Sequence, residues 1–470
     1  MFGDSRLEDR FDQLLSDMVS HGSNVIHQIS SSQSSEVAYY RFYKNKRVKI
    51  ADLISHLVAP TASRVRGRHV LILGDSTEIS LKAQLAHIRD QERVGVLSDN
   101  KTPGFHMHVS MCLDAESGHG LGLSDLMVWN RAPAQGSKQA RDRARRSRPW
   151  SEKESYKWAL GIEKSLEVLS DASCQTFIFD AESDTLDVWQ GLQKWPAEAI
   201  IRLNHNRKVI GHQASETGMK IREYLAAQAP AGQYSFALRE LKRRNYSRNQ
   251  AQKRQARQAQ MEVRFAQVEL DGFPQHQRPY YLVHAQELPQ SVPEGEDPLD
   301  WLLLTTHPIG TFEQAYQIIQ WYGQRWMIEQ LFRISKRKGF AIEETELEYL
   351  DSILKQSLTT IKASFEVMQL LLARDQMEGQ PIETVFEPQQ IQCLKALDRK
   401  YQGRTAKQQN PYPPDQLSWA TWILARMGGW KGIPSRRPPG PIILFRGLKR
   451  FNMTFEGWRL LTNEGDVTEP

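Results

Sequence analysis

Hydrophobic residues recur along the chain with two different periods, and together they predict a mixture of helices and strands. FDQLLSDMVSHG repeats its apolar residues every three or four positions and stops at Gly22, as an amphipathic helix does. Two apolar runs, RHVLILGDS at 68–76 and QTFIFD at 175–180, predict buried strands that each finish at or near an aspartate. YSFALR and MEVRFAQVEL alternate apolar and polar residues, as antiparallel strands do. The pattern favours an α/β protein.

Weaker patterns fill in the rest of the chain. The serine-rich start of 30–59 precedes a further helix, and Ser151 with Glu154 three residues later has the signature of a helix N-cap. The Gly-His-Gly turn at 118–120 divides 104–131 into two or three strands. Further expected elements are a helix at 185–194, strands at 198–204, 279–288 and 301–309, and a mostly helical region from 322 to the C-terminus.

Charge and cysteine usage narrow the class of protein. The 470 residues carry a net charge of +6 with a pI of about 9.0, and the basic residues are clustered. Residues 137–150 hold six bases and one acid, and residues 239–260 hold eight bases and one acid. The three cysteines form no C-x-x-C pair, and no run of about 18 apolar residues occurs. We expect a soluble, intracellular protein without a zinc ribbon or a disulfide framework.

A helix from 322 to 339 would gather several polar side chains on one face. At about 100° per residue they share a stripe roughly 80° wide. The side chains are Tyr322, Arg325, Glu329, Arg333 and Lys336. The stripe is either a solvated face with an Arg325–Glu329 ion pair, or a carboxylate set among cations that bind phosphate. The helix alone leaves both hypotheses open.

The two strand-end aspartates, Asp75 and Asp180, add a second pattern. Carboxylates at strand ends converge at the edge of an α/β sheet, where functional sites form. With Glu329 they would make three acids that repel one another unless divalent cations are bound, and their oxygens suit Mg²⁺ or Mn²⁺. Two such ions can activate a water or a 3′-hydroxyl on one side of a phosphorus and stabilise the leaving oxygen on the other. Each aspartate taken singly is more often a strand cap or a turn residue.

On these residues the chain resembles the DDE transposases of the bacterial insertion-sequence-four family, of the transposon-five type, along nearly its whole length. The family signature Y-x-x-R-x-x-x-E-x-x-x-x-x-x-K is present as Tyr322, Arg325, Glu329 and Lys336. Asp75 in LILGDST is similar to the first catalytic aspartate, and Asp180 in FIFDAESD is similar to the second. GDSRLEDR and AYYRF resemble the N-terminal end-recognition domain, and RMGGWKG and LFRGLKRF resemble the C-terminal region.

The resemblance implies roles for these residues and for several others. Asp75, Asp180 and Glu329 would be the catalytic metal ligands, while Arg325, Lys336 and Tyr322 would hold phosphates of the transposon end, with Arg333 on the same face. Trp301, 21 residues before Tyr322, matches a family tryptophan that stacks in the pocket of a flipped base, with a core tryptophan as the alternative. Arg202, 22 residues after Asp180, matches an arginine that contacts DNA. DNA contacts are also expected from Arg10, Arg41, Arg243, Arg244, Lys253 and Arg254, the last four in a basic clamp at 239–260.

The fold and partners implied are those of a cut-and-paste DNA transposase. We expect a helical end-recognition DNA-binding domain at 1–62, a ribonuclease-H-like core at 63–362 and a helical region that mediates dimerisation at 363–470. The core would be a mixed sheet flanked by helices, with an inserted antiparallel β region at about 215–300. The cofactor would be two Mg²⁺ or Mn²⁺ ions per site. The partners would be double-stranded DNA, as transposon ends and target, and a second copy of the chain when both are on DNA. No membrane is implied, and the place of action would be the bacterial cytoplasm, at the nucleoid when bound to DNA.

The chain departs from the family pattern in three places. Gly74 stands where an acid commonly precedes the first aspartate, and Ala181 stands where Arg or Gly often follows the second. About twenty residues that usually precede the Gly-Asp-x-Arg motif are absent, since the motif begins at Gly3. Two alternatives therefore stay open: a catalytically silent DNA-binding or inhibitory derivative, and a ribonuclease-H-like nuclease with another role. For the basic run at 137–150, a nonspecific contact with the DNA backbone and a solvated loop are equally open.

Overall fold

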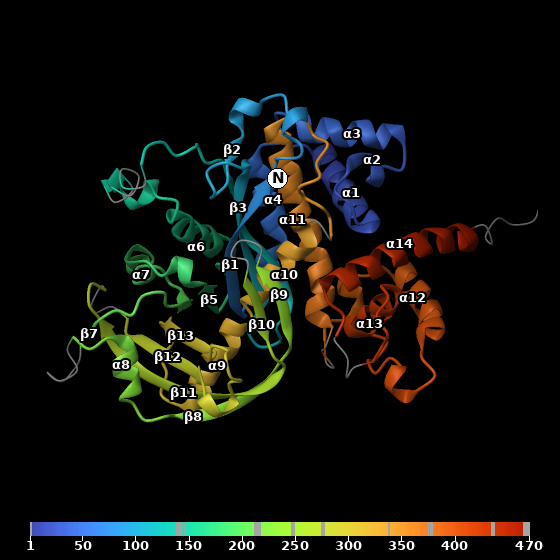
Figure 1. Cartoon of the computed structure of the whole chain (residues 1–470). Helices are drawn as coiled ribbons and strands as arrows, with labels where there is room; N and C mark the ends of the chain where they lie inside the picture. The colour runs from blue at the N-terminus through green and yellow to red at the C-terminus, as the bar shows by residue number, and fades with distance from the viewer. Residues whose placement is uncertain are drawn as a thin grey trace, which may run out of the picture.

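The computed structural model describes residues 2–137, 139, 143–144, 147–210, 218–245, 250–273, 278–336, 339–374, 376, 379–433 and 438–463, without the side chains of 241–253, 407 and 462–463. It shows a mixed sheet with helices on both faces and further helices at the two ends of the chain (Figure 1). No helix in these ranges is both long and apolar enough to cross a membrane.

One sheet of eleven strands runs through the described part of the protein. Its order is β2-β3-β1-β5-β6-β13-β12-β11-β7, with β4 paired to β3 and β8 paired to β11. The strands are β1 His69–Ser80, β2 Gly95–Val96, β3 Pro103–Asp114, β4 Gly120–Trp129, β5 Cys174–Phe179, β6 Glu198–Arg202, β7 Val209–Ile210, β8 Gly232–Leu238, β11 Arg257–Leu270, β12 Tyr280–Glu287 and β13 Asp300–Thr305. Only β1, β5 and β6 are parallel to one another, and the other pairs are antiparallel. The sheet is therefore mixed, with a parallel centre.

Helices bury both faces of this sheet. The main ones are α1 Ser5–His21, α2 Ile26–Ile29, α3 Gln33–Lys44, α4 Ile50–Arg64, α6 Tyr156–Val168, α7 Leu186–Leu192, α8 Ile221–Ala226, α9 Phe312–Gly323, α10 Trp326–Ser335, α11 Leu350–Ala373, α12 Pro388–Tyr401, α13 Leu417–Met427 and α14 Pro441–Asn463. Leu71 and Leu73 of β1 pack in the core shared with α4 and α9–α11, whereas Val70 and Ile72 pack in the core shared with α6, α7 and α8. This alternation follows from the period of two in a strand that is buried on both faces.

The N-terminal and C-terminal helices pack against the long helix α11. Helices α1, α3 and α4 contact it from one end of the chain, and α13 and α14 contact it from the other (Figure 1). Lys355 of α11 is buried and donates to the carbonyl oxygens of Tyr43 and Asn45 at 3.3 and 3.2 Å, which caps the end of α3. The helices expected before residue 62 are thus present and are attached to the rest of the fold.

Two predicted helix boundaries were wrong. The single helix expected within 30–59 is divided into α3 and α4, because the Asn45 side chain accepts a hydrogen bond from the Arg47 amide at 2.9 Å and forms a turn. The N-cap expected at Ser151 lies instead at Ser155, because the amides of Glu152 and Lys153 close a short 3₁₀ turn first. In both places a local turn competes with the helical pattern.

The β region expected at about 215–300 divides into two parts. Strands β8, β11 and β12 extend the central sheet. Strands β9 Leu241–Asn245 and β10 Gln250–Arg254 form a separate two-stranded hairpin. The basic segment 239–260 is therefore built largely on this hairpin and on the start of β11.

Candidate active site

Asp75 and Asp180 lie side by side on adjacent parallel strands. The register of β1 with β5 runs from His69 opposite Cys174 to Leu73 opposite Ile178. Asp75 comes two residues after Leu73, and Asp180 comes two residues after Ile178, so both carboxylates continue the same row of the sheet. β1 itself continues to Ser80, paired with β3, so Asp75 is not at its end as expected. β5 does end there, and the edge of the parallel pair is where the two acids meet.

Arg325 joins Glu329 to this pair. Its Nη2 donates to Glu329 Oε1 at 2.7 Å, and its Nη1 donates to Asp75 Oδ2 at 3.4 Å. The side chains are partly enclosed, with 17% of Arg325, 18% of Asp75 and 32% of Glu329 exposed. One guanidinium thus bridges acids that are 254 residues apart in sequence, between β1 and α10.

The pKa of Asp75 reports the crowding of acids at this edge. Burial raises its pKa to about 6, and the charges of Asp180 and then Glu329 act in the same direction. The Ser76 amide, which donates to Asp75 Oδ1 at 2.7 Å, and the Arg325 charge partly offset the rise. Groups that repel each other in a partly buried site are a frequent property of functional sites.

A break in the helix sets the direction of Arg325. The helix predicted from 322 to 339 is divided into α9 and α10, so Tyr322 lies in the last turn of α9 and Glu329 in the first turns of α10. Gln324 and Arg325 keep right-handed helical angles, but the Arg325 amide bonds the Tyr322 carbonyl at 3.0 Å, three residues back. Helical angles at Gln324 and Arg325, with only the isolated Gly323 at the break, explain why the sequence pattern predicted one continuous helix.

Lys336 and Arg333 end α10 differently from the predicted stripe. Lys336 is the C-cap residue in extended conformation, and its Nζ donates to the Glu78 carbonyl at 2.8 Å. Burial lowers the pKa of Lys336, while the charges of Glu343 and Glu78 oppose that change. Arg333 donates to Gln330 Oε1 at 3.3 Å and lies over the Trp326 ring, 5.7 Å from its centre. The five polar residues of 322–336 therefore do not form a single helical face. We call Asp75, Asp180, Arg325, Glu329 and Lys336 the carboxylate edge.

Trp301, Tyr322 and Arg202 lie together beside this edge. Trp301 is half-buried near the start of β13, and its ring meets the Tyr322 ring edge-on with 5.5 Å between centres. Tyr322 is buried, which raises its pKa. Arg202 pairs with Leu303 across β6 and β13, and its Nη2 donates to the Asp300 carbonyl at 3.3 Å. The sheet thus brings an aromatic pair and an exposed arginine to one place.

Gly74 has a physical explanation in this structure. A Cβ at position 74 would come within 2.5 Å of Cε1 of Phe179, the residue before Asp180. The space of the side chain that is absent at Gly74 is therefore filled by Phe179 from the neighbouring strand. This local exchange accounts for the departure from the family pattern without moving either aspartate.

The sequence pattern missed a set of supporting residues under the carboxylate edge. His108 on β3 lies opposite Ser76, and its Nδ1 is 2.9 Å from Ser76 Oγ. It is fully buried, which lowers its pKa to about 3, and its ring packs edge-on against Trp158. Lys157 is also buried and pairs with Glu182 at 2.7 Å. These partners are 25 to 32 residues apart in sequence, so only the fold brings them together.

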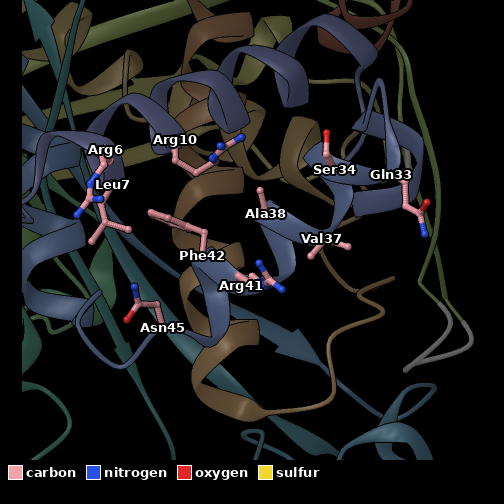
Figure 2. Close-up of a pocket in the computed structure, with 10 residues that line it drawn as sticks. All are labelled: Arg6, Leu7, Arg10, Gln33, Ser34, Val37, Ala38, Arg41, Phe42 and Asn45. Carbon is pink, nitrogen blue, oxygen red and sulfur yellow. The ribbon is translucent and has the colours of Figure 1, made fainter.

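Arg10 and Arg41 lie far from the acids in sequence and line a pocket between α1 and α3. Figure 2 shows the pocket, which has a volume of about 550 Å³. Its lining comprises Arg6, Leu7, Arg10, Gln33, Ser34, Val37, Ala38, Arg41, Phe42 and Asn45. Arg6 is paired with Asp4 at 3.0 Å, whereas Arg10 and Arg41 make no hydrogen bond or ion pair with another residue in the described ranges. We call this site the N-terminal pocket.

The predicted basic clamp is only partly described. Arg254 Nε donates to the Arg239 carbonyl at 3.4 Å, across the base of the β9–β10 hairpin. The side chains of Arg243, Arg244 and Lys253 lie outside the described residues, as do four of the six bases of the run at 137–150. Their expected DNA contacts stay predictions.

The carboxylate edge has the donor chemistry for a divalent metal. Asp75, Asp180 and Glu329 offer only hard carboxylate oxygens, and one guanidinium, that of Arg325, bonds two of the three acids. In the part of the chain that the structure describes, no group of three or more His, Cys, Asp or Glu side chains is arranged to hold an ion. The residues fit a divalent cation in kind, with Arg325 between two of them.

One family model matches this region. Residues 165–365 match the model described as "Transposase DDE domain", from within α6 to within α11. The matched range contains Asp180, Trp301, Glu329 and Lys336, while Asp75 precedes it. The mixed sheet flanked by helices fits a ribonuclease-H-like domain of this kind, and such domains generally use divalent metals. The match indicates that residues 165–365 belong to a DDE transposase domain, the domain of polynucleotidyl transferases that act on DNA.

Proposed function

We propose that this protein is a cut-and-paste transposase of the insertion-sequence-four, transposon-five type. It binds inverted terminal repeats, cleaves at the transposon ends through a hairpin intermediate and joins the 3′ ends to target DNA. The observation that carries the proposal is the Arg325 bridge between Asp75 and Glu329, beside Asp180 at the edge of the parallel strands. Three acids drawn from strands and a helix around one partly buried point suit phosphoryl transfer more than structural support.

The catalytic groups in this proposal are Asp75, Asp180 and Glu329. Their carboxylates would hold two Mg²⁺ or Mn²⁺ ions, whose chemistry is to activate an attacking hydroxyl and to stabilise the leaving oxygen. Arg325 keeps the carboxylates of Asp75 and Glu329 in a fixed orientation, and its guanidinium has further N–H donors available for a phosphate. A bound cation would relieve the repulsion that the charges of Asp180 and Glu329 add to the effect of burial on Asp75.

DNA binding is assigned to the surrounding residues. Lys336 and Tyr322 hold phosphates near the acids, and Arg333 and Arg202 hold phosphates further away. Trp301 stacks on a base that leaves the duplex, and its contact with the Tyr322 ring fixes its orientation. Arg10 and Arg41 in the N-terminal pocket, and Arg243, Arg244, Lys253 and Arg254 in the clamp, supply phosphate contacts outside the site.

The domains of the proposed enzyme follow the same division. Residues 1–62 recognise the transposon end, residues 63–362 carry the chemistry, and residues 363–470 bring two copies together on DNA. Helices α1 and α3, which form the N-terminal pocket, and helices α13 and α14 come from opposite ends of the chain and pack on α11.

The test is metal-dependent cleavage of DNA. A labelled duplex that carries the DNA flanking the gene is incubated with the protein and Mg²⁺, and nicked, hairpin and excised products are separated. Asp180→Ala should abolish all three products and leave DNA binding largely intact. Binding without any cleavage by the unaltered protein would instead support the alternative, a catalytically silent derivative. Cleavage that does not depend on the flanking repeats would support a nuclease of another role.

A further inference from the structure

An ion pair between a buried lysine and an exposed glutamate lies next to Asp180 in the chain, and no function has yet been given to it. Lys157, the second residue of α6, is 8% exposed, and its Nζ donates to Glu182 Oε1 at 2.7 Å. Glu182 is the second residue after Asp180 and is 59% exposed. The pair therefore connects the interior under the sheet to the chain segment that carries the second acid.

The Lys157 side chain is held by aromatic rings. Its Nζ lies 5.3 Å from the centre of the Trp158 ring and 5.9 Å from the centre of the Trp129 ring. Trp158 is fully buried and packs against Phe179, with 4.8 Å between ring centres. The ammonium group therefore has little freedom, and it lies within reach of the segment that follows β5, where Glu182 accepts its hydrogen bond.

Glu182 in turn fixes the Asp180 carboxylate. The Glu182 amide donates to Asp180 Oδ1 at 2.9 Å, which makes Asp180 the N-cap of the single 3₁₀ turn Ala181–Ser183. In the described part of the structure this is the one hydrogen bond that the Asp180 side chain accepts from the protein. Ser183 closes the same turn by donating from its hydroxyl to the Asp180 carbonyl at 2.8 Å. The rotamer of Asp180 thus depends on where Glu182 is held.

Stability alone gives a poor reason for such a pair. Burying a lysine charge is costly, and an ion pair with a largely exposed partner returns little stability. Fixing the direction of a catalytic carboxylate is a different matter, because metal affinity depends on the groups that orient each ligand. The pair lies at a position where it can do this for Asp180.

We propose that Lys157 and Glu182 are positioning residues for Asp180, which hold its carboxylate in the direction that binds the divalent cation. Neither side chain touches the substrate in this proposal. It rests on the proposed function, in which Asp180 is a metal ligand. Lys157 sets the place of Glu182, and the Glu182 amide sets the place of the Asp180 oxygen.

The experiment uses Lys157→Met, Glu182→Gln and the double variant of the full chain. Met keeps an unbranched apolar stem between the tryptophans, and Gln keeps the shape of Glu. The matched control is Lys164→Met, since Lys164 forms an exposed ion pair with Glu167 on the same helix at 3.2 Å. The affinity for Mn²⁺ is measured by calorimetry without DNA, together with DNA binding and nicking of a plasmid that carries the DNA flanking the gene.

We expect each single variant to weaken Mn²⁺ binding and raise the Mn²⁺ needed for nicking by roughly 10- to 100-fold. The double variant should bind Mn²⁺ about as well as the single variant with the lower Mn²⁺ affinity. The two losses should not add, because both changes break the same link. DNA affinity should not change, and Lys164→Met should resemble the unaltered protein. Glu182→Gln tests the proposal even if Lys157→Met fails to fold, since its side chain is mostly exposed.

Two results would overturn the proposal. One is unchanged Mn²⁺ affinity in Glu182→Gln. The other is an opposite effect on DNA, in which Glu182→Gln strengthens binding and Lys157→Met weakens it, because then Lys157 is a phosphate ligand that Glu182 competes for. Asp180→Ala separates this failure from failure of the proposed function. If Asp180→Ala still binds Mn²⁺ and nicks, the function is wrong; if it does neither while the pair variants are normal, only this inference is wrong.

Discussion

At the carboxylate edge, basic side chains are bonded to protein oxygens, whereas in the N-terminal pocket Arg10 and Arg41 have no such partner in the described ranges. Arg325 donates to two carboxylates and Lys336 donates to a backbone carbonyl. The edge is partly buried, and the pocket is an open groove between α1 and α3 (Figure 2). Both regions are candidates for DNA contact. A phosphate would meet basic groups already bonded to protein oxygens at the edge, and guanidiniums without such bonds in the pocket.

This difference predicts that the carboxylate edge determines the reaction rate and that the N-terminal pocket determines the affinity for DNA. A phosphate that reaches Arg325 or Lys336 exchanges one hydrogen-bond partner for another, so the net gain is small, but the direction of each donor is already fixed. A phosphate that reaches Arg10 or Arg41 replaces only water and counterions, so binding there adds affinity that depends on salt. We therefore expect changes at the edge to affect reaction rate and changes in the pocket to affect binding.

The largest effect should come from Glu329. Glu329→Gln removes a charge at the edge and leaves the shape of the side chain, so cleavage should slow on the order of 1,000-fold or more while DNA affinity is unchanged. Single-turnover cleavage and a gel-shift titration measure the two quantities. Glu344→Gln, an exposed glutamate beyond α10, is the control. A parallel loss of rate and affinity in Glu329→Gln would break the division between the two regions.

The next largest effect is on the pH dependence of stability. It distinguishes Asp75 of the carboxylate edge from Asp125, a carboxylate whose pKa is raised by burial elsewhere in the fold. Burial raises the pKa of Asp125 on β4 to about 7, and its Oδ2 has no hydrogen-bond partner in the described structure. Both Asp125 and Asp75 have a folded pKa above the usual 3.8, so the folded state holds its proton more tightly than the unfolded state. Their contributions to stability are present below about pH 4 and are lost as pH rises, through about 6 for Asp75 and about 7 for Asp125.

At about 1.4 kcal/mol per pKa unit, the losses are on the order of 3 kcal/mol for Asp75 and 4 kcal/mol for Asp125. Thermal unfolding from pH 4 to 8 should therefore show a falling midpoint. Addition of Mn²⁺ or the change Asp75→Asn should remove the loss of stability due to Asp75. Only Asp125→Asn should remove the loss due to Asp125. Binding of DNA by Arg10 and Arg41 should not follow this pH range, because arginine stays protonated. If Mn²⁺ leaves the loss of stability due to Asp75 unchanged, Asp75 is not a metal ligand.

These acids also show which site residues can be predicted from the sequence and which cannot. Asp75, Asp180 and Glu329 could be picked out because each stands in a local pattern, an apolar strand or a helical motif, and their catalytic roles stay predictions. Asp125 has no such pattern, since its pKa depends on what the fold packs around it. The same holds for Lys157, whose partner Glu182 is 25 residues away.

The helix at 322–339 illustrates the opposite error. Its residue spacing predicted a single helix, and the residues are helical in angle, but a shift to bonds three residues back turns α10 away from α9. Gly323, the last residue of α9, stands at this change, but an isolated glycine is tolerated within a helical pattern and did not by itself predict a break. Strands β1 and β5 were predictable because a period of two or a short apolar run suffices for them, whereas the hydrogen-bond partner of one amide depends on tertiary contacts.

Trp301 should show an intermediate effect, confined to one step. Stacking on an extruded base is worth roughly 1–3 kcal/mol, so Trp301→Ala should slow hairpin formation roughly 5- to 150-fold with little change in the first nick. An abasic nucleotide at the flipped position should restore part of the rate. The control is Trp321→Ala, because Trp321 is a partly buried tryptophan that donates to the Ala115 carbonyl at 3.2 Å. Equal loss of both steps in Trp301→Ala, with a lower unfolding temperature as in the control, would mean that Trp301 is a core residue.

The smallest effect belongs to the N-terminal pocket. Arg10→Gln and Arg41→Gln should each weaken DNA binding about 2- to 5-fold, the size of one exposed charge contact. Together they should reduce the slope of log affinity against log salt by about 2, because each phosphate contact releases close to one counterion. The rate of nicking at saturating protein should not change, in contrast to Glu329→Gln. Lys395→Gln, an exposed base on α12, is the control. If the double variant keeps the affinity and the salt slope of the unaltered protein, Arg10 and Arg41 do not bind DNA. The assignment of reaction rate to the edge and of DNA affinity to the pocket would then be wrong.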